Sequence, residues 1–264
     1  MPYEFDEDSR AEAADHGINA ADAKRLRVQC TRKELELGPG GVRNHAVKFS
    51  FPAWNDPPGS LPSVIPRDGC ISRGDVLDVG ADVRDGKRRA TDLLTASFIW
   101  GTGPTGYGPR RYRDLVTAAD DHLESALQRV LKVITENSDG PGIIAGYAQL
   151  YGGYEPDKRA IAGQEPWSRT HGFGPAFFTK FLYFSTPGAL ILDNRLATAV
   201  HALSGLDYLI TDDGRSCAWS PYRYAVYLHW MHQTSRALSV PPDLLEATLF
   251  SPPADPLDEH DAAD

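Results

Sequence analysis

The chain has 264 residues, of which 41% are hydrophobic, and its formal net charge at pH 7 is -9. This length suits one large or two small domains with a real core, and no run of about 18 apolar residues could span a membrane. The first residues are acidic where a secretory signal is basic, so we expect a cytoplasmic protein, associated with the nucleoid if it is bacterial. Cys30, Cys70 and Cys217 lie far apart in the sequence, which excludes a disulfide framework and a four-cysteine iron-sulfur cluster.

The negative charge is concentrated at the two ends of the chain. Residues 1–24 and residues 251–264 each carry a net charge of -5, which leaves +1 for the body. We expect both ends to be acidic tails that are either disordered or bound to the surface of the body. A near-neutral body permits DNA binding but is not evidence for it, because affinity for DNA comes largely from neutralising phosphates.

The following segment, residues 25–71, is expected to be mostly irregular and packed on the body, because it is dense in Pro and Gly over much of its length. Its start, RLRVQCTRKELELGPGG, could hold a short strand or a short helix. Ser72 followed by Asp75 forms a capping box, which predicts a helix over about residues 73–84. Apolar residues at helical spacing predict a second helix that ends at Gly101. A glycine-rich connection then leads to Arg110 and Arg111.

Seven basic residues and only two acids lie between positions 84 and 113. A solvated basic face is one interpretation, and contact with a nucleic-acid backbone is the other. On the second interpretation, Arg110 and Arg111 are the candidate contacts to the DNA backbone. The glycines of the connection do not form a nucleotide-binding motif, because no strand precedes them and no G-K-[ST] follows.

Helical periodicity continues through the rest of the body. It predicts one long or two abutting helices over 114–136, then shorter helices over 143–150, 156–169, 194–204 and 242–250, and a longer one over 221–238. No segment alternates convincingly as a strand, so the body, residues 72–250, is expected to be mostly α. His229 and His232 have a spacing compatible with metal ligands, but no third ligand supports them and we predict no metal site.

The most informative stretch begins with the turn Gly172-Phe173-Gly174, part of a hairpin over 170–175, and continues with Pro175 at the first position of an apolar helix. Glycines can adopt positive φ and allow close approach of another molecule, and the free amides of a helix N-terminus bind anions. An ordinary turn between helices is the alternative. After a short loop, an apolar run delivers Asp193 at the N-cap of the next helix, where it either caps that helix or also carries chemistry.

Together, the G-x-G-P turn, the apolar helix, the short loop and the acid resemble the signature of the helix-hairpin-helix DNA glycosylases. The segments WGTGPTGYGPRR, GFGPAFFTKFLYF, ALILD and PDLLEATLF are similar to bacterial proteins with the 8-oxoguanine DNA glycosylase fold, over about residues 72–250. The resemblance implies that Gly172, Phe173 and Gly174 hold a DNA phosphate. It also implies that Asp193, 19 residues after Gly174, lies beside the sugar of a flipped nucleotide.

The same resemblance implies a monomer that acts on double-stranded DNA with a modified base, an oxidised purine being one option. No cofactor is expected, with a monovalent or divalent cation at the hairpin left open. Members with lyase activity use a Lys just after the hairpin, where this chain has Ala176. Lys180 lies one helical turn further on the same face, and it either extends into solvent or shares a polar cavity with Asp193. Lyase chemistry and excision by water both stay open.

A flipped base needs an aromatic or apolar pocket. The candidates for its walls, each of which could equally be a core residue, are Trp100, Tyr107, Phe177, Tyr183 and Tyr224. The rival to an enzyme is a non-catalytic module that uses the same hairpin to bind DNA or a protein partner.

Overall fold

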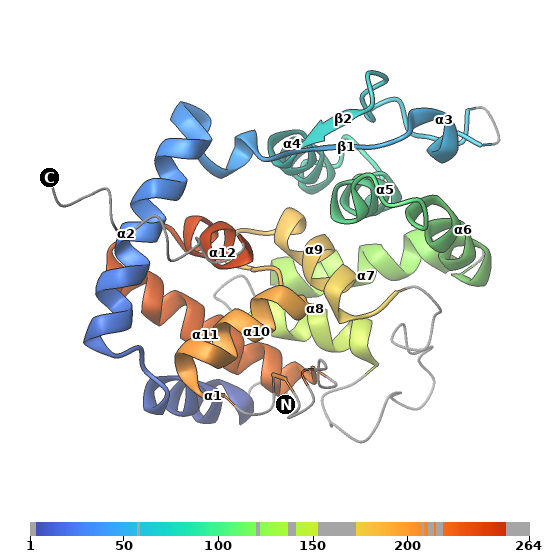
Figure 1. The fold of residues 1–264 in the computed structure, drawn as a ribbon. Coiled ribbons are helices and arrows are strands. Elements are labelled where there is room, and N and C mark those ends of the chain that lie inside the picture. The colour runs from blue at the N-terminus through green and yellow to red at the C-terminus, as the bar shows by residue number, and fades with distance from the viewer. Residues whose placement is uncertain are drawn as a thin grey trace, which may run out of the picture.

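The computed structural model describes residues 4–56, 59–119, 122–136, 141–152, 173–206, 209–210, 214 and 219–251. Within these ranges the chain is mostly helical, as the sequence predicts (Figure 1). The helices are α1 (Glu4–Asp15), α2 (Ala20–Leu37), the 3-10 helix η1 (Gly38–Asn44), α3 (Phe51–Trp54), α4 (Arg73–Arg84), α5 (Ala90–Thr102), α6 (Gly108–Ala119), α7 (Leu123–Glu136), α8 (Pro141–Tyr151), α9 (Pro175–Ser185), α10 (Asn194–Ser204), α11 (Pro221–Leu238) and α12 (Pro242–Phe250). Among these, no helix is both long and apolar enough to cross a membrane.

Two short strands, β1 (Ala46–Lys48) and β2 (Cys70–Ser72), form an antiparallel pair in which Val47 faces Ile71. The sequence did not indicate them, because three residues are too few for an alternating pattern to be recognised. The pair brings the segment before β1 next to the start of α4, where Arg73 donates its backbone N–H to the carbonyl of His45 at 2.8 Å.

The apolar helix α9 runs through the middle of the molecule and packs against α4, α5 and α8 (Figure 1). Its side chains at Phe178, Phe181, Leu182 and Phe184 are fully buried. A helix that is apolar on all faces must be surrounded by protein, so the sequence correctly predicts a core helix here. The chain then returns through an extended segment to α10, which packs with α12, and α12 in turn packs on α2.

Several helix boundaries follow the local signals that predict them. Ser72 accepts a hydrogen bond from the N–H of Asp75 at 3.0 Å, and Asp75 accepts one from the N–H of Ser72 at 2.8 Å, which completes the capping box of α4. The helix predicted over 221–238 is α11, with those bounds. The stretch 114–136 contains parts of two helices, α6 and α7, and the helix predicted over 156–169 lies outside the described residues.

Of the two alternatives for the acidic residues 1–24, the described part corresponds to a segment bound to the body and not to a disordered tail. Helix α1 packs against α11, with Ala13 fully buried, and the indole N–H of Trp230 donates to the carbonyl of His16 at 2.8 Å. Charge composition hid this packing, because one small buried face is enough to hold a short helix whose other faces carry the acids. The tail predicted over 251–264 lies outside the described residues after Ser251.

The start of residues 25–71 is helical, which is one of the two alternatives that the sequence left open for it. Helix α2 extends to Leu37 and ends where Gly38 adopts a positive φ of 69°. Leu26 and Cys30 bury one face of this helix. The Pro-rich part that follows contains only η1, α3 and the two short strands.

Candidate active site

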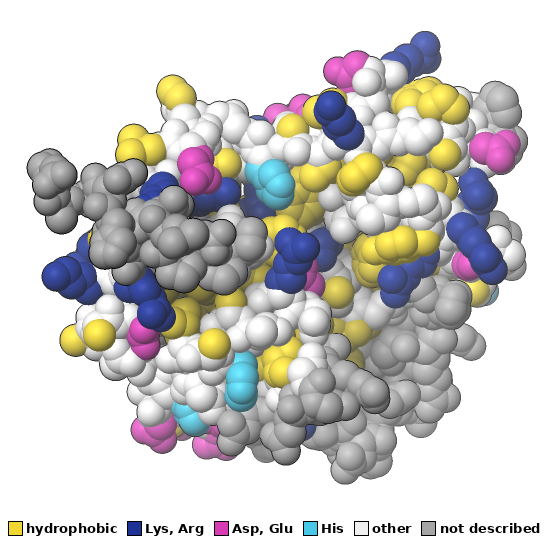
Figure 2. Space-filling view, in the orientation of Figure 1, with side chains coloured by type: hydrophobic (Ala, Val, Ile, Leu, Met, Phe, Trp, Pro, Cys, Tyr) yellow, Lys and Arg dark blue, Asp and Glu magenta, His cyan; other side chains and the backbone are white. Residues whose placement is uncertain are grey.

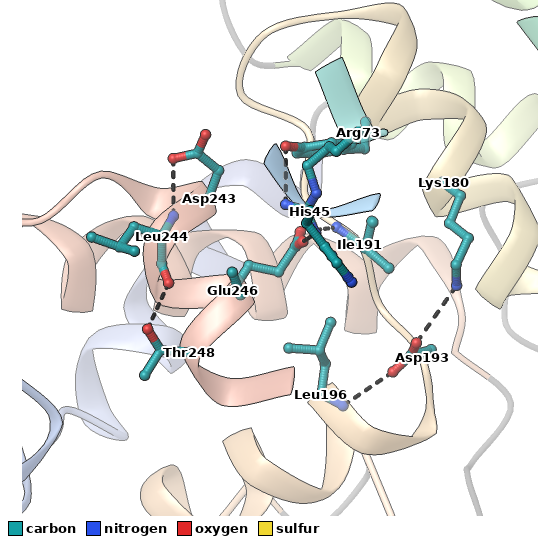
Figure 3. Close-up of polar contacts among 12 residues, drawn as sticks. His45, Arg73, Lys180, Ile191, Asp193, Leu196, Asp243, Leu244, Glu246 and Thr248 are labelled. Atoms are coloured by element: carbon teal, nitrogen blue, oxygen red, sulfur yellow. Dashed lines mark hydrogen bonds and ion pairs between the residues drawn. The ribbon is translucent and has the colours of Figure 1, made fainter. Parts of the chain in front are cut away.

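Asp193 is the N-cap residue of α10, and its two carboxylate oxygens have different partners (Figure 3). Oδ1 accepts hydrogen bonds from the N–H groups of Arg195 at 3.1 Å and Leu196 at 3.2 Å. Oδ2 lies 3.5 Å from Nζ of Lys180. The capping and the chemical interpretation of Asp193 are therefore compatible, because one oxygen satisfies the helix and the other remains directed at the lysine.

Lys180 projects from α9 toward Asp193 and does not extend into solvent, since its side chain is only 8% exposed (Figure 3). Its Nζ also donates to the carbonyl of Ala176 at 3.0 Å and lies 5.7 Å from the centre of the Phe177 ring. Burial lowers the pKa of Lys180, and the nearby carboxylates of Asp193 and Glu246 offset this only in part. A larger fraction of the amine is thus unprotonated than for a surface lysine, which is the condition for a nucleophilic amine.

The extended segment before Asp193 is held by buried polar groups from α9 and α11. Tyr224 donates its hydroxyl to the carbonyl of Leu190 at 2.8 Å, and Tyr227 donates to that of Ile191. Thr179 of α9 accepts from the N–H of Leu192 at 3.1 Å. Because both edges of this short segment are hydrogen-bonded, the position of Asp193 is fixed by the protein core rather than by a mobile loop.

A buried ion pair lies behind this segment. Glu246 of α12 accepts from the N–H of Ile191 at 2.7 Å and pairs with Arg73 of α4 at 3.1 Å, with side chains only 1% and 3% exposed (Figure 3). Arg73 also donates to the hydroxyl of Tyr183 on α9 at 3.2 Å. This pair connects α4, α9, α12 and the segment that carries Asp193. Removing one partner would leave an uncompensated buried charge, at a cost of about 3–5 kcal/mol.

Burial governs the ionisation of this cluster. It raises the pKa of Glu246 more than the charge of Arg73 and the amide of Ile191 lower it. It also raises the pKa of Tyr183, to about 12, so this phenol stays protonated. Sequence reasoning missed both Arg73 and Glu246. The available signal was an acid within the apolar run PDLLEATLF, which has to find a buried partner if that helix packs in the core.

The aromatic residues expected to form a base pocket have different surroundings in the structure. Trp100 and Tyr183 both stack on the Arg73 guanidinium, whose Cζ lies 4.9 Å and 5.1 Å from their ring centres. A buried cation needs such compensation, so it occupies ring faces that a base would otherwise use. Tyr224 is fully buried in the core of α11, with its hydroxyl bonded to the main chain.

The two remaining candidates for the base pocket, Phe177 and Tyr107, lie near α6. Phe177 stacks on Phe98 with ring centres 4.2 Å apart, and the guanidinium of Arg111 lies 4.8 Å from the Phe177 ring. Tyr107 is 53% exposed in the connection before α6. Together with Arg110, Arg111 and Asp114 it lines an open cavity of about 410 Å³.

The glycine turn is described only from Phe173 onward, and Gly172 lies outside the described residues. Gly174 has a φ of -112°, which any residue can adopt, so the expected positive φ is not found there. Among the described residues, no atom lies within 4 Å of a Cβ added at Gly174. The Phe173 side chain is buried in the core, which leaves only its backbone for contact with an anion. Within the part of the chain that the structure describes, no side chain caps the N-terminus of α9.

Most of the basic residues between 84 and 113 have partners in the protein. Arg84 donates to the carbonyl of Ser185 at 2.8 Å, and Arg113 donates to that of Ala53 at 3.3 Å. Acidic side chains lie within ion-pair distance of four more, in the pairs Lys87–Asp85, Arg88–Asp82, Arg89–Glu124 and, at 3.9 Å, Arg110–Asp114. Such pairs are typical of a solvated charged face, and in addition Arg110 and Arg111 line the cavity beside Tyr107.

One face of the molecule is hollowed where hydrophobic side chains gather, and Lys or Arg and Asp or Glu side chains lie beside this hollow (Figure 2). No cluster of three or more potential metal ligands occurs in the described ranges. One of the two histidines considered as ligands, His232, instead has its Nε2 2.8 Å from the carbonyl of Gly188.

The helical architecture, with an apolar central helix that leads through a short segment to an acid at the next helix start, is that of the 8-oxoguanine DNA glycosylase fold class. Residues 40–250 match the family described as "Putative 8-oxoguanine DNA glycosylase OGG-like protein", and the chain belongs to this family. No curated protein and no solved structure matches it significantly. The family match includes Arg73, Lys180, Asp193 and Glu246 but begins after α1 and α2.

Proposed function

We propose that the protein is a DNA glycosylase that removes a modified base, with an oxidised purine as the first candidate, from double-stranded DNA. The observation that carries the proposal is the Lys180–Asp193 pair, 3.5 Å apart and largely buried, in a chain of this family. An amine with a lowered pKa beside a carboxylate fixed in position is a suitable arrangement for attack on a sugar carbon.

In this mechanism the target nucleotide is flipped out of the duplex so that its sugar reaches Asp193. Cleavage of the N-glycosidic bond develops positive charge on the sugar, which the carboxylate stabilises. In the hydrolytic route a water adds to C1′, Asp193 accepts its proton, and the base leaves with the bonding electrons. In the lyase route the unprotonated amine of Lys180 adds to C1′ instead, and the base again leaves with the electrons of the glycosidic bond. Asp193 then accepts a proton from the new amine, and cleavage of the C1′–O4′ bond opens the sugar ring and gives the protonated Schiff base.

DNA contact is assigned to the two ends of the site. The backbone of Gly172, Phe173 and Gly174, with the uncapped N-terminus of α9, is proposed to hold one phosphate. Arg110 and Arg111 are proposed to contact the backbone from α6, and Tyr107 and Phe177 to form part of the surface that meets the bases. The protein is proposed to act as a monomer.

The substitution Asp193→Asn tests the proposal with little disturbance of the fold. Asn caps helices about as well as Asp, so α10 stays stable while the carboxylate is lost. We expect excision to fall by about 10²–10⁴-fold, in line with the loss of a positioned acid-base group. The measurement is a screen of duplex oligonucleotides, each with one modified base, followed by cleavage of the resulting abasic site.

A matched control is Asp78→Asn, which changes an exposed acid far from Asp193 in the sequence and should leave excision unchanged. Lys180→Gln separates the two routes, because it abolishes borohydride trapping but allows excision by water. If wild type and Asp193→Asn both show only background excision on every substrate while binding DNA equally, the protein is the non-catalytic module instead.

A further inference from the structure

Gly101, in the last turn of α5, lies directly against the side chain of Lys180. A Cβ added at Gly101 would lie 2.6 Å from Cδ and 3.0 Å from Cε of Lys180, which is closer than real Cβ contacts. Gly101 is not among the glycines with positive φ, so its backbone does not require glycine. Alanine is also the better helix former. The reason for a glycine at this position is therefore the Lys180 side chain, which occupies the space that a Cβ would fill.

The Lys180 side chain is confined by its neighbours where it approaches Asp193. Its side chain is almost fully buried, and its Nζ is bonded to the carbonyl of Ala176 while it faces Asp193. The Phe177 ring lies beside the Lys180 side chain on the side that faces Gly101, since it lies 3.8 Å from the Cβ position of that glycine. The positive charge of Arg73 also lowers the pKa of Lys180, because it disfavours a second positive charge nearby.

Helix α5 is too well anchored to move away from an added methyl group. The neighbours of Gly101, Trp100 and Thr102, are buried. The indole N–H of Trp100 donates to the carbonyl of His45 at 3.3 Å, and its ring contacts Arg73. A methyl group at Gly101 would consequently displace the lysine chain rather than the helix.

We infer that Gly101 is a positioning residue for the proposed chemistry: because it has no side chain, the Lys180 side chain can lie against α5 and still reach Asp193. This inference rests on the proposed function for its catalytic meaning. The geometric part of the inference is that a side chain at position 101 displaces the Lys180 amine. This part does not depend on the proposed function, and it can be measured without DNA.

The first test compares Gly101→Ala with wild type by amine acylation and mass spectrometry of the folded protein. We expect acylation of Lys180 to increase several-fold, because the displaced amine turns toward solvent. Gly17→Ala is the matched control, since Gly17 also lacks positive φ and its added Cβ would make only an ordinary contact at 3.4 Å. On a substrate found in the oligonucleotide screen, Gly101→Ala should lower the rate of Schiff-base trapping by about 10²-fold, as expected for a misplacement of about 1 Å.

The second test is a double-mutant cycle with Lys180→Ala, which removes the atoms that the new methyl would meet. In that background Gly101→Ala should raise Tm by about 1–3 °C through helix propensity, whereas with Lys180 present it should not raise Tm. An additive cycle together with unchanged Lys180 acylation overturns the inference. If the cycle is non-additive but no substrate is ever excised, the positioning claim stands and the proposed function fails.

Discussion

Lys180 and Arg73 are two buried cations in one cluster, and they are compensated differently. Arg73 has a charge partner, Glu246, at 3.1 Å, two aromatic faces and a phenol. Lys180 has Asp193 at 3.5 Å and one carbonyl. The pKa of Arg73 is raised because Glu246 and Tyr183 together outweigh burial, whereas that of Lys180 is lowered because burial outweighs its partners. The cluster therefore keeps one cation permanently charged and leaves the other able to lose its proton.

The ionisation of Lys180 gives a prediction with a definite sign. Its pKa should lie below the ordinary lysine value of about 10.4, as read from the pH dependence of Lys180 acylation in the folded protein. The Asp193 carboxylate favours the protonated amine, so Asp193→Asn should move the midpoint to a lower pH still. Asp78→Asn is the control and should leave it in place. A midpoint that rises in Asp193→Asn would mean that this carboxylate does not stabilise the ammonium form.

At the scale of elements, local signals in the sequence predict helices better than they predict what the helices pack against. The capping box at Ser72, proline at the start of α9 and α11, and Gly205 after α10 mark real boundaries, since each acts on neighbouring backbone groups. For α2 the apolar residues are few, and its high charge suggests a solvated segment. Its partner α12 lies more than 200 residues later in the sequence, so no local pattern indicates the contact.

Helix α2 offers a matched pair of leucines that tests its packing. Leu26 is 2% exposed and Leu35 is 78% exposed on the same helix. We expect Leu26→Ala to lower the free energy of unfolding by about 2–5 kcal/mol, as for a leucine removed from a packed core. Leu35→Ala should change it by less than about 0.5 kcal/mol. Denaturant unfolding measures both, and equal small effects would show that α2 does not belong to the core.

At the scale of the whole molecule, the resemblance to a known family is what predicts the fold. It also predicts part of the candidate site. The turn, the apolar helix and Asp193 form one continuous stretch of the sequence. Their short spacing made a contact between Lys180 and Asp193 one of the two arrangements that the sequence allowed. The Arg73–Glu246 pair joins residues 173 positions apart, and it determines which aromatic faces are occupied. Pairings of this kind depend on the assembled core, which is why the sequence could not indicate that Arg73 covers the rings of Trp100 and Tyr183, whereas the Lys180–Asp193 contact was one of its two alternatives.

The distribution of charge over the whole molecule predicts a weak salt dependence of DNA binding. Most cations between 84 and 113 have acidic or backbone partners in the protein, and Arg110 and Arg111 line the open cavity beside Tyr107 where we propose DNA contact. Neutralising about two phosphates gives a slope of log K against log salt of about -1.8, so affinity should fall only about 12-fold between roughly 50 and 200 mM salt.

Titrations of a duplex oligonucleotide at several salt concentrations measure this slope. The double substitution Arg110→Gln and Arg111→Gln should bring it close to zero, whereas Arg88→Gln, which removes a cation already paired with Asp82 at 2.9 Å, should leave it nearly unchanged. A wild-type slope steeper than about -5 would correspond to six or more neutralised phosphates. It would mean that the internally paired arginines exchange their acidic partners for DNA, and that the basic segment as a whole forms the DNA-binding face.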